Sequence, residues 1–480
     1  MKGEMHDFFA KTRPSRLFLA VALPGAVSML ASSLYACVDG VLVGRFLGST
    51  AFAAQSFIFS FVVINFALAD LIGVGSAVPI SISLGRGDEE QANNIFSCAC
   101  AMIVAAGAVI GAALYFAAPL IARLMGAEGE LARLAVEYLR VYAVCSPLTT
   151  IIFAVDNYLR VCGYVRGSMA LNIFMSAISC ALEFLFLGVL GFGIWGASLA
   201  TCLGMMVSAA IAFAPFFLGR AQLRFRRPRF SFAMTRRIVA AGAPNFLNNI
   251  AGRVTSIMMN MLLIRLGGAD AVSVYGILMT IEYLVLALCY GLCDGLQPAV
   301  GYNWGAGRYG RVKAIEKYCF ASSAAVSFTS AAVIFIFPAQ IASLFISDAS
   351  PAFIDMAVYA MRLFSATYLL RWFSFATQSY MLAVERPAGA TAISLSTALI
   401  FPVLLIFLLR PLGLTGLWLN FAGTALLAAL LSLEVLRRFK KRAARHSADK
   451  TAEKSREAVK KQKFTGRPQL RASRFAHRSV

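Results

Sequence analysis

Two acidic residues interrupt apolar segments of this chain that are long enough to cross a lipid bilayer. Asp39 lies near the end of one segment and Glu183 near the end of another, with Ser179 one helical turn before Glu183. A charged side chain near the bilayer centre costs about 2.5–3.5 kcal/mol on insertion scales, so each one needs a physical reason. Carboxylates can hold a proton or, together with a hydroxyl oxygen, ligate a sodium ion. The alternative is that each acid only hydrogen-bonds to a neighbouring helix.

The predicted helices place the two carboxylates at similar depths. Asp39 is about four residues before the end of a helix over 17–43, and Glu183 is about seven before the end of a helix over 167–190. Both helices run in the same direction, and a rise of about 1.5 Å per residue separates the two carboxylates by roughly one turn. If the two helices line the same lobe, we expect Asp39 and Glu183 to share a proton or bind Na⁺.

Three other acidic residues lie in or near apolar segments. Asp70 is deep in a predicted helix over 51–84, and we keep it as a further candidate for the cation-coupling site. Asp156 and Asp294 fall toward helix ends, where we expect them to reach the membrane interface.

The spacing of charges in the second half of the chain predicts a pair between Arg253 and Glu282. Each lies twelve residues from the adjoining ends of two successive helices, predicted over 237–265 and 270–304. At about 1.5 Å per residue both are roughly 18 Å along their helices. We expect a buried ion pair, because an unpaired charge at that depth is costlier still. The alternative is that one or both line a substrate cavity.

Several polar and polarisable side chains could line such a cavity. They are Tyr35, Gln55, Asn65, Tyr275 and Tyr283, together with Met258, Met259, Met261 and Met279. Such groups bind amphipathic compounds through dispersion and a few hydrogen bonds. For each of them, burial in the core or exposure to lipid is the alternative.

The chain offers no pattern for catalysis or for a resident metal. Its ten cysteines are scattered through apolar segments, and its three histidines lie near the termini. No Ser-His-Asp, His-rich or nucleotide-binding arrangement is present. We therefore expect no enzymatic activity and no cofactor, which excludes an ATP-driven pump in one chain. The cysteines are expected to fill space between helices.

The composition is that of a polytopic membrane protein. Of 480 residues, 59% are hydrophobic and 14% are charged, whereas a soluble protein carries about 25% charged residues. The apolar runs are too continuous for a β-barrel, so the spans are helices. The positions of Gly, Pro and charge clusters predict twelve helices, over 17–43, 51–84, 93–119, 130–158, 167–190, 193–219, 237–265, 270–304, 312–338, 351–382, 388–409 and 413–436.

The distribution of Lys and Arg predicts the orientation. Seven arginines and no acidic residue lie at 220–237, whereas the loop near residue 350 carries Asp348 and Asp355. Positive loops remain cytoplasmic, and an even number of spans puts both termini on one side. We therefore expect a multi-pass membrane protein with both termini in the cytoplasm.

The predicted organisation has five parts. They are a cytoplasmic segment over 1–16, an N lobe over 17–219, a basic linker over 220–236, a C lobe over 237–436 and a basic tail over 437–480. The tail contains 16 Lys and Arg against 3 Asp and Glu, which is +13 of the net +21. We expect it to be disordered and to contact anionic lipid rather than nucleic acid. We expect a monomer.

The two lobes share a spacing of landmark residues. Pro24, Arg45, Gly48, Gly75, Gly85 and Gly87 recur 220 residues later as Pro244, Arg265, Gly268, Gly295, Gly305 and Gly307. We expect the prolines to bend the first helix of each lobe, and Gly75 and Gly295 to act as hinges or close packing points. Repeated helical units in a membrane protein commonly enclose a transport pathway.

The segments VDGVLVGRFLG at 38–48 and GLCDGLQPAVGYNWGAG at 291–307 resemble the multidrug and toxic compound extrusion (MATE) transporters, most closely the MepA-type bacterial branch. The resemblance implies two six-helix lobes around a central cavity. It also implies export of amphipathic, often cationic compounds in exchange for protons or sodium ions, with xenobiotic efflux and antibiotic resistance as the physiological consequence.

Some positions depart from the family pattern. The fifth helix of the family usually reads Asn, three residues, then Asp, and the matching positions here hold Ser179 and Glu183. Asp294 and Glu282 stand where glutamine is common. The alternative functions are a lipid-linked oligosaccharide flippase, which shares the two-lobe plan, and an exporter of one specific metabolite.

Overall fold

The chain folds into long helices that can cross a membrane. The structure, a computed structural model, describes residues 8–124, 127–345 and 350–465, with nearly all side chains given up to Lys441. In this part of the chain eleven helices are long and apolar enough to span a bilayer, and a pair bent by 47° makes a twelfth. The described residues contain no strand. The prediction of an all-α, twelve-span protein is therefore confirmed.

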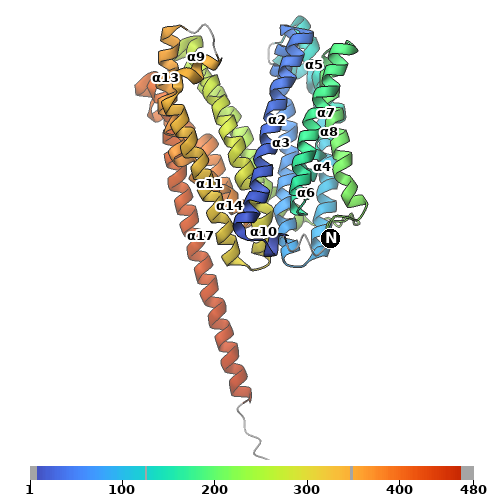
Figure 1. The fold of residues 1–480 in the computed structure, drawn as a ribbon, viewed down its shortest axis with the longest axis vertical. Helices are drawn as coiled ribbons and strands as arrows, with labels where there is room; N and C mark the ends of the chain where they lie inside the picture. Colours follow the sequence, from blue (N-terminus) through green and yellow to red (C-terminus); the bar gives the residue numbers. More distant parts are fainter. Residues whose placement is uncertain (1–7, 125–126, 346–349, 466–480) are drawn as a thin grey trace, which may run out of the picture. The chain divides into compact units, whose positions relative to one another are not determined.

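The first six spans form the N lobe (Figure 1). Their helices are α2 (Pro14–Leu47), α3 (Ser49–Gly85), α4 (Glu89–Leu124), α5 (Gly129–Thr149), α6 (Ile151–Val161), α7 (Val165–Phe184) and α8 (Ile194–Phe217), and the π-helical turn η1 (Leu185–Val189) extends α7. The predicted fourth helix is divided into α5 and α6, and Pro147 lies just before the break. Proline removes a backbone donor from a helix interior, which explains the interruption.

The C lobe contains the remaining spans. Its first helices are α9 (Phe232–Cys293), the short 3₁₀ turn η2 (Asp294–Leu296), α10 (Gln297–Gly305), α11 (Tyr309–Ile336) and α12 (Pro338–Phe345). They are followed by α13 (Pro351–Ser365), α14 (Tyr368–Ala383), α15 (Pro387–Leu395), the π turn η3 (Ser396–Ile400), α16 (Phe401–Leu408), the 3₁₀ turn η4 (Arg410–Leu412) and α17 (Gly413–Thr465).

Two features of α9 and α10 follow from single residues. Gly268 adopts φ 67° and turns the chain directly from the seventh span to the eighth, because glycine tolerates this left-handed region. Pro298 cannot donate to the carbonyl of Asp294, and the N–H of Gln297 bonds that carbonyl instead. This shorter bond produces the 3₁₀ turn that divides the predicted helix over 270–304.

The end of the chain differs from the sequence-based expectation. Residues 1–429 and 430–480 form two separate compact units, and α17 continues as a helix to Thr465 instead of ending near residue 436. The segment is rich in Ala, Lys, Arg and Glu, which favour helix, and Arg438 pairs with Glu434 one turn earlier. The predicted disorder therefore does not describe 437–465, and residues 466–480 lie outside the described residues.

Each lobe has an apolar core of its own. One cluster of buried residues draws only on positions between Val43 and Cys202 and includes Ile58 and Tyr138. The other draws only on positions between Met259 and Trp418 and includes Phe364. The lobes also pack on each other, because α9 of the C lobe lies against both α2 and α3 of the N lobe.

Repeated glycines bring the two lobes into contact. Gly85 at the end of α3 lies so close to the backbone carbonyl of Tyr302 that an added Cβ would collide with it. Gly305 at the end of α10 lies equally close to the carbonyl of Ile82. Tyr302 is the repeat equivalent of Ile82, so the contact is reciprocal. Small residues of this kind allow helix backbones to approach closely in a membrane.

Three further glycine contacts join the lobes. Gly25 of α2 meets Gly291 of α9, Gly242 of α9 meets Leu71 of α3, and Gly75 meets both Gly242 and the carbonyl of Ile238. All of these residues lie in the halves of their helices nearest the start of α2. We call this side of the membrane the termini side.

Gly305→Ala is expected to destabilise the full chain, because the new methyl group must displace the Ile82 carbonyl. Overpacking against a rigid neighbour costs roughly 1–3 kcal/mol. Thermal unfolding in detergent measures the effect as a lower melting temperature. Gly276→Ala is the matched control, since a Cβ there meets no atom within 4 Å. Equal melting temperatures for the two variants would show that the glycine contact does not stabilise the fold.

Candidate functional site

Asp39 and Glu183 lie together inside the N lobe. Asp39 projects from α2, which packs directly against α3 and α7. The Gln55 amide of α3 donates to the Asp39 carboxylate at 2.6 Å and lies 3.3 Å from the hydroxyl of Tyr138 on α5. The carboxylate of Glu183 on α7 is an immediate electrostatic neighbour of Asp39. We call Asp39, Gln55, Tyr138 and Glu183 the acid cluster.

Glu183 has unsatisfied acceptors. Its side chain is 0% exposed, and no donor in the described part of the chain bonds either carboxylate oxygen, so a hydrogen bond between Glu183 and Asp39 requires a proton held between the two carboxyl groups. The carbonyl oxygen of Gln55 is also buried without a donor in that part of the chain. A buried carboxylate without donors is strongly unfavourable unless a cation or a proton neutralises it. The acid cluster therefore has the chemistry of a cation-binding site.

Other polar side chains border the acid cluster. Tyr35 of α2 bonds Thr201 of α8 at 2.7 Å, and its hydroxyl interacts electrostatically with both acids. Ser179 packs against Gly204 of α8, where a Cβ would collide with its hydroxyl oxygen. Sequence reasoning did not identify Tyr138 or Thr201. The sequence signal that could have identified Tyr138 is its spacing from Tyr142. The two residues lie four positions apart and so place two hydroxyl groups on one face of a helix.

Asp70 belongs to a different group of charges. The charges that act on it are those of Asp156 and Arg160, both on α6. It therefore does not lie with Asp39 and Glu183, where we had grouped it. The count along α3 gave the depth of Asp70 but not the neighbouring helix that its side chain faces.

Asp156 is the centre of a polar network on the termini side. It pairs with Arg160 at 2.5 Å, accepts from Asn172 at 3.0 Å and accepts a hydrogen bond from Ser168. The Arg160 guanidinium also donates to Ser168 at 3.0 Å. Both members of the ion pair are nearly buried, so Asp156 is less accessible than the interfacial position we expected.

Asp294 of the C lobe lies near the polar network around Asp156 and Arg160. It accepts hydrogen bonds from Gln297 and Ser379, each at 2.7 Å, and it interacts electrostatically with Arg160. Pro24 and Gly295, two of the expected hinge residues, line a small enclosed space with Arg160. The inter-lobe contact on the termini side therefore contains a polar network beside its glycines.

The expected ion pair between Arg253 and Glu282 is not formed. Glu282 instead accepts from Arg371 of α14 at 2.6 Å, and both side chains are mostly buried. Arg253 is exposed on α9. The residue count placed Arg253 and Glu282 at one depth, but a pair also needs the two side chains to face each other. That second condition depends on how each helix is rotated about its axis.

The other candidate residues occupy varied positions. Asn65 is buried and bonds Ser146 at about 2.9 Å, so it is a core residue. Tyr275 is also buried and donates to Ser256 at 3.2 Å. Tyr283 is 58% exposed and remains the candidate most available to a ligand. The carbonyl of Pro244 accepts from the Ser394 hydroxyl of α15 at 2.6 Å, a bond that ties α9 to α15 at the proline.

The cysteines and acids form no resident metal site in the described residues. No group of three His, Cys, Asp or Glu side chains converges there. The nine described cysteines are free, and seven of them are buried between helices. Cys145 of α5 lies beside Cys202 of α8.

Comparison with known proteins gives one family throughout. Residues 24–185 and 244–408 each match the profile of the MatE family, and the two matches begin 220 residues apart. The multidrug export protein MepA of Staphylococcus aureus is 26% identical over 445 residues, which cover 91% of this chain and 97% of that protein. The protein of the same name from Staphylococcus saprophyticus is 27% identical over 447 residues, again 91% and 97% of the two chains.

Solved structures share the fold. One, described as the outward-facing conformation of a multidrug resistance MATE family transporter, superposes with a TM-score of 0.83 at 23% identity. The alignment covers 90% of this chain and 97% of that one. A MATE crystal structure in complex with the compound MaL6 gives a TM-score of 0.84 at 22% identity over 91% and 98% of the chains.

Arg371→Gln and Glu282→Gln are each expected to lower the yield and melting temperature of the protein. Either change leaves a mostly buried charge without its partner, which costs up to about 3–5 kcal/mol where burial is complete. The exchanged double variant, Glu282→Arg with Arg371→Glu, should recover part of the loss. Arg253→Gln is the control and should leave both quantities unchanged. An effect of Arg253→Gln as large as that of Arg371→Gln would contradict the assigned pairing.

Proposed function

The chain belongs to the MatE family, and on that premise we propose that it is a secondary active exporter of amphipathic, cationic compounds. Members of this family are transporters and not enzymes, and relatives of this chain export multiple drugs. We further propose that export is driven by the entry of H⁺ or Na⁺ and that the acid cluster binds this coupling ion.

The observation that carries the proposal is the environment of Glu183. It is completely buried, no donor among the described residues bonds either of its oxygens, and Asp39 lies beside it. Two neighbouring buried carboxylates attract one cation strongly, because each loses hydration on burial and repels the other. A proton or a sodium ion neutralises this charge.

Coupling follows from competition for the same negative charge. An ion that enters from outside neutralises the acid cluster and removes the attraction for a cationic substrate. The bound ion also changes how α2, α3, α5 and α7 are held together, since each contributes a residue to the cluster. Release of the ion to the cytoplasm restores the charge. Each pH unit of gradient supplies about 1.4 kcal/mol per proton.

We propose that the termini side faces the cytoplasm, in agreement with the seven arginines at 220–237. The glycine contacts between the lobes described above are all on that side. Close inter-lobe contact on the cytoplasmic side is expected when the pathway is closed to the cytoplasm and open to the outside.

The basic tail fits this orientation. A cytoplasmic tail with 16 Lys and Arg is attracted to the anionic lipids of the inner leaflet. We therefore propose a monomeric, multi-pass protein of the bacterial inner membrane whose tail contacts lipid and not nucleic acid.

The C-lobe cations favour efflux over transport of a pyrophosphate-linked lipid. A flippase of that kind needs several unpaired cations in its cavity to hold the pyrophosphate. Of the two deep arginines, Arg371 is neutralised by Glu282 and only Arg253 has no acidic partner among the described residues.

Asp39→Asn and Glu183→Gln are each expected to abolish gradient-driven transport of a cationic dye such as ethidium in everted vesicles. Each change removes one of the two charges that hold the coupling ion. Proton and sodium gradients are imposed separately on vesicles that contain equal amounts of each variant, and dye uptake is followed by fluorescence. Glu130→Gln, which removes an acid that is 67% exposed, is the matched control and should transport normally.

Two results would reject parts of this proposal. Full gradient-driven transport by Asp39→Asn would exclude the acid cluster as the coupling site. No response of the wild-type protein to either gradient would exclude ion-coupled efflux and favour the flippase or the exporter of a specific metabolite.

A further inference from the structure

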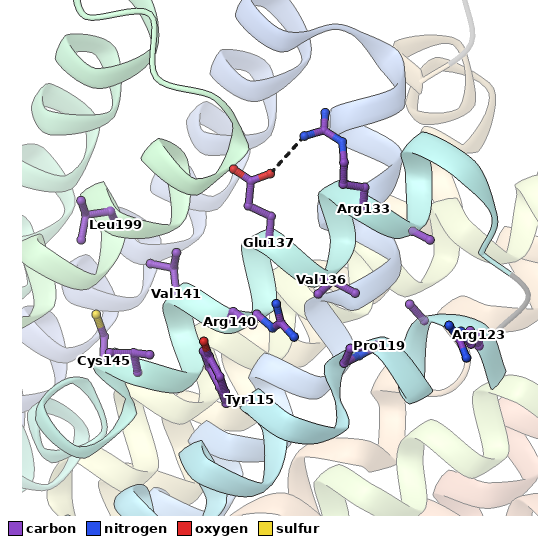
Figure 2. Close-up of a pocket in the computed structure, with 13 residues that line it drawn as sticks. Tyr115, Pro119, Arg123, Arg133, Val136, Glu137, Arg140, Val141, Cys145 and Leu199 are labelled. Atoms are coloured by element: carbon purple, nitrogen blue, oxygen red, sulfur yellow. Dashed lines mark ion pairs between the residues drawn. The ribbon is translucent and has the colours of Figure 1, made fainter.

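A groove on the outer surface of the N lobe has no part in the proposed transport reaction. It lies between the end of α4 and α5, along α5 from Ala132 to Cys145, with Leu199 of α8 also in its lining, and has a volume of about 730 Å³ (Figure 2). Its residues do not include any member of the acid cluster.

The two ends of the groove differ in chemistry. Arg123, Arg133 and Arg140 line one part, with Glu137 as the acid among the lining residues. Val141, Val144, Cys145 and Leu199 line the other part. Figure 2 shows Arg133, Arg140, Val141 and Cys145 along α5, with Arg123 on α4 and Leu199 on α8. The groove is therefore amphipathic along its length.

Among the described residues, two of the three groove arginines have no acidic side chain beside them that neutralises their charge. Arg133 lies 3.7 Å from Glu137, the ion pair drawn in Figure 2, and 3.8 Å from Glu130. The guanidinium of Arg140 lies over the ring of Tyr115 at 5.1 Å, a contact that orients it without neutralising it. Arg123 and Arg140 have no acidic partner in the described part of the chain.

The groove spans the boundary between headgroups and hydrocarbon. The spans built from α4 and from α5 with α6 contain 35 and 33 residues, or roughly 50 Å of helix against a hydrocarbon thickness of about 30 Å. The helix ends at Arg123 and Arg133 therefore extend beyond the hydrocarbon, while Val144 lies within it. Phe116 and Val144 are 80% and 67% exposed, so this face of the lobe is turned to lipid.

We propose that the groove binds one anionic phospholipid of the surrounding leaflet. The lipid phosphate contacts Arg123 and Arg140, because charge-assisted bonds from a guanidinium match phosphate geometry. An acyl chain lies along Val141, Val144 and Leu199. A zwitterionic lipid fits less well, since its ammonium group needs an acid and the Glu137 carboxylate is near Arg133.

The position of α5 gives this lipid a structural role. The face of α5 opposite the groove carries Tyr138, whose hydroxyl lies near Gln55 of the acid cluster. Cys145 is in the groove and beside Cys202 within the lobe. A lipid that holds α4 and α5 together therefore also fixes one wall of the acid cluster. The binding site itself does not depend on the proposed transport activity.

The test uses the purified full chain, delipidated in detergent and titrated with phosphatidylglycerol or phosphatidylethanolamine, with bound lipid counted by native mass spectrometry. Arg123→Gln with Arg140→Gln should weaken phosphatidylglycerol binding about tenfold. Arg123→Lys with Arg140→Lys should retain most of it. Arg265→Gln with Arg410→Gln is the control, because it removes two exposed arginines outside the groove and should bind as the wild type does. The basic tail is present in all variants.

A second readout places the lipid in the groove. Phosphatidylglycerol should slow alkylation of Cys145 by N-ethylmaleimide in the wild type but not in the Gln double variant, as measured on the Cys145 peptide. Unchanged phosphatidylglycerol binding in the Gln double variant, or no protection of Cys145, would overturn the proposal. Glycerol phosphate that competes as well as phosphatidylglycerol would show a simple anion site in place of a lipid site and would also overturn it.

Discussion

The close approach of backbones at Gly85 and Gly305 is the contact on which the arrangement of the lobes depends. Lipid is as apolar as a leucine side chain, so two bundles in a membrane gain little by hiding apolar surface from each other. They associate where backbones can touch over a wide area, and only glycine permits that. Because the contact is reciprocal, with Tyr302 and Ile82 in equivalent roles, neither lobe can change its tilt at this point independently of the other.

The repeated scaffold carries charges that are not repeated. At the 220-residue offset Asp39 corresponds to Met259, Glu183 to Val403 and Glu282 to Val62. In the C lobe the Glu282 charge is neutralised by Arg371, whereas the acid cluster of the N lobe has no cation among the described residues. A cation that enters between the lobes therefore meets a much stronger attraction on one side than on the other. If the acid cluster binds the coupling ion as proposed, this departure from symmetry determines where the ion binds.

Sequence reasoning was most successful where depth alone decided the outcome. The spans follow from apolar length, and the neighbouring positions of Asp39 and Glu183 follow from counting residues along two helices that run the same way. It failed where rotation about a helix axis decided the outcome. Glu282 pairs with Arg371 instead of Arg253, and the charges that act on Asp70 are those of Asp156 and Arg160 instead of Asp39. Helix rotation is set by side-chain packing across the whole bundle, which no local pattern records.

Other structural features involve residues that are visible in the sequence, but the effect of those residues depends on contacts that only the fold defines. Pro298 explains the 3₁₀ turn at Asp294 only once the missing hydrogen bond is located. Gln55 reads as one more polar residue in an apolar helix until its contacts with Asp39 and Tyr138 are known. The basic groove escaped notice because its arginines belong to two helices and resemble ordinary interfacial charges when read along the chain.

The single residue Gly268 joins the seventh and eighth spans with hardly any chain between them. Two spans connected so tightly must leave the translocon as one helical hairpin, since the first cannot settle in the bilayer while the second is still outside it. The C lobe thus begins its assembly with the seventh and eighth spans already paired. A tag or protease site inserted at Gly268 would divide that pair during synthesis, which makes this turn far less tolerant of insertion than the longer connection at 220–231.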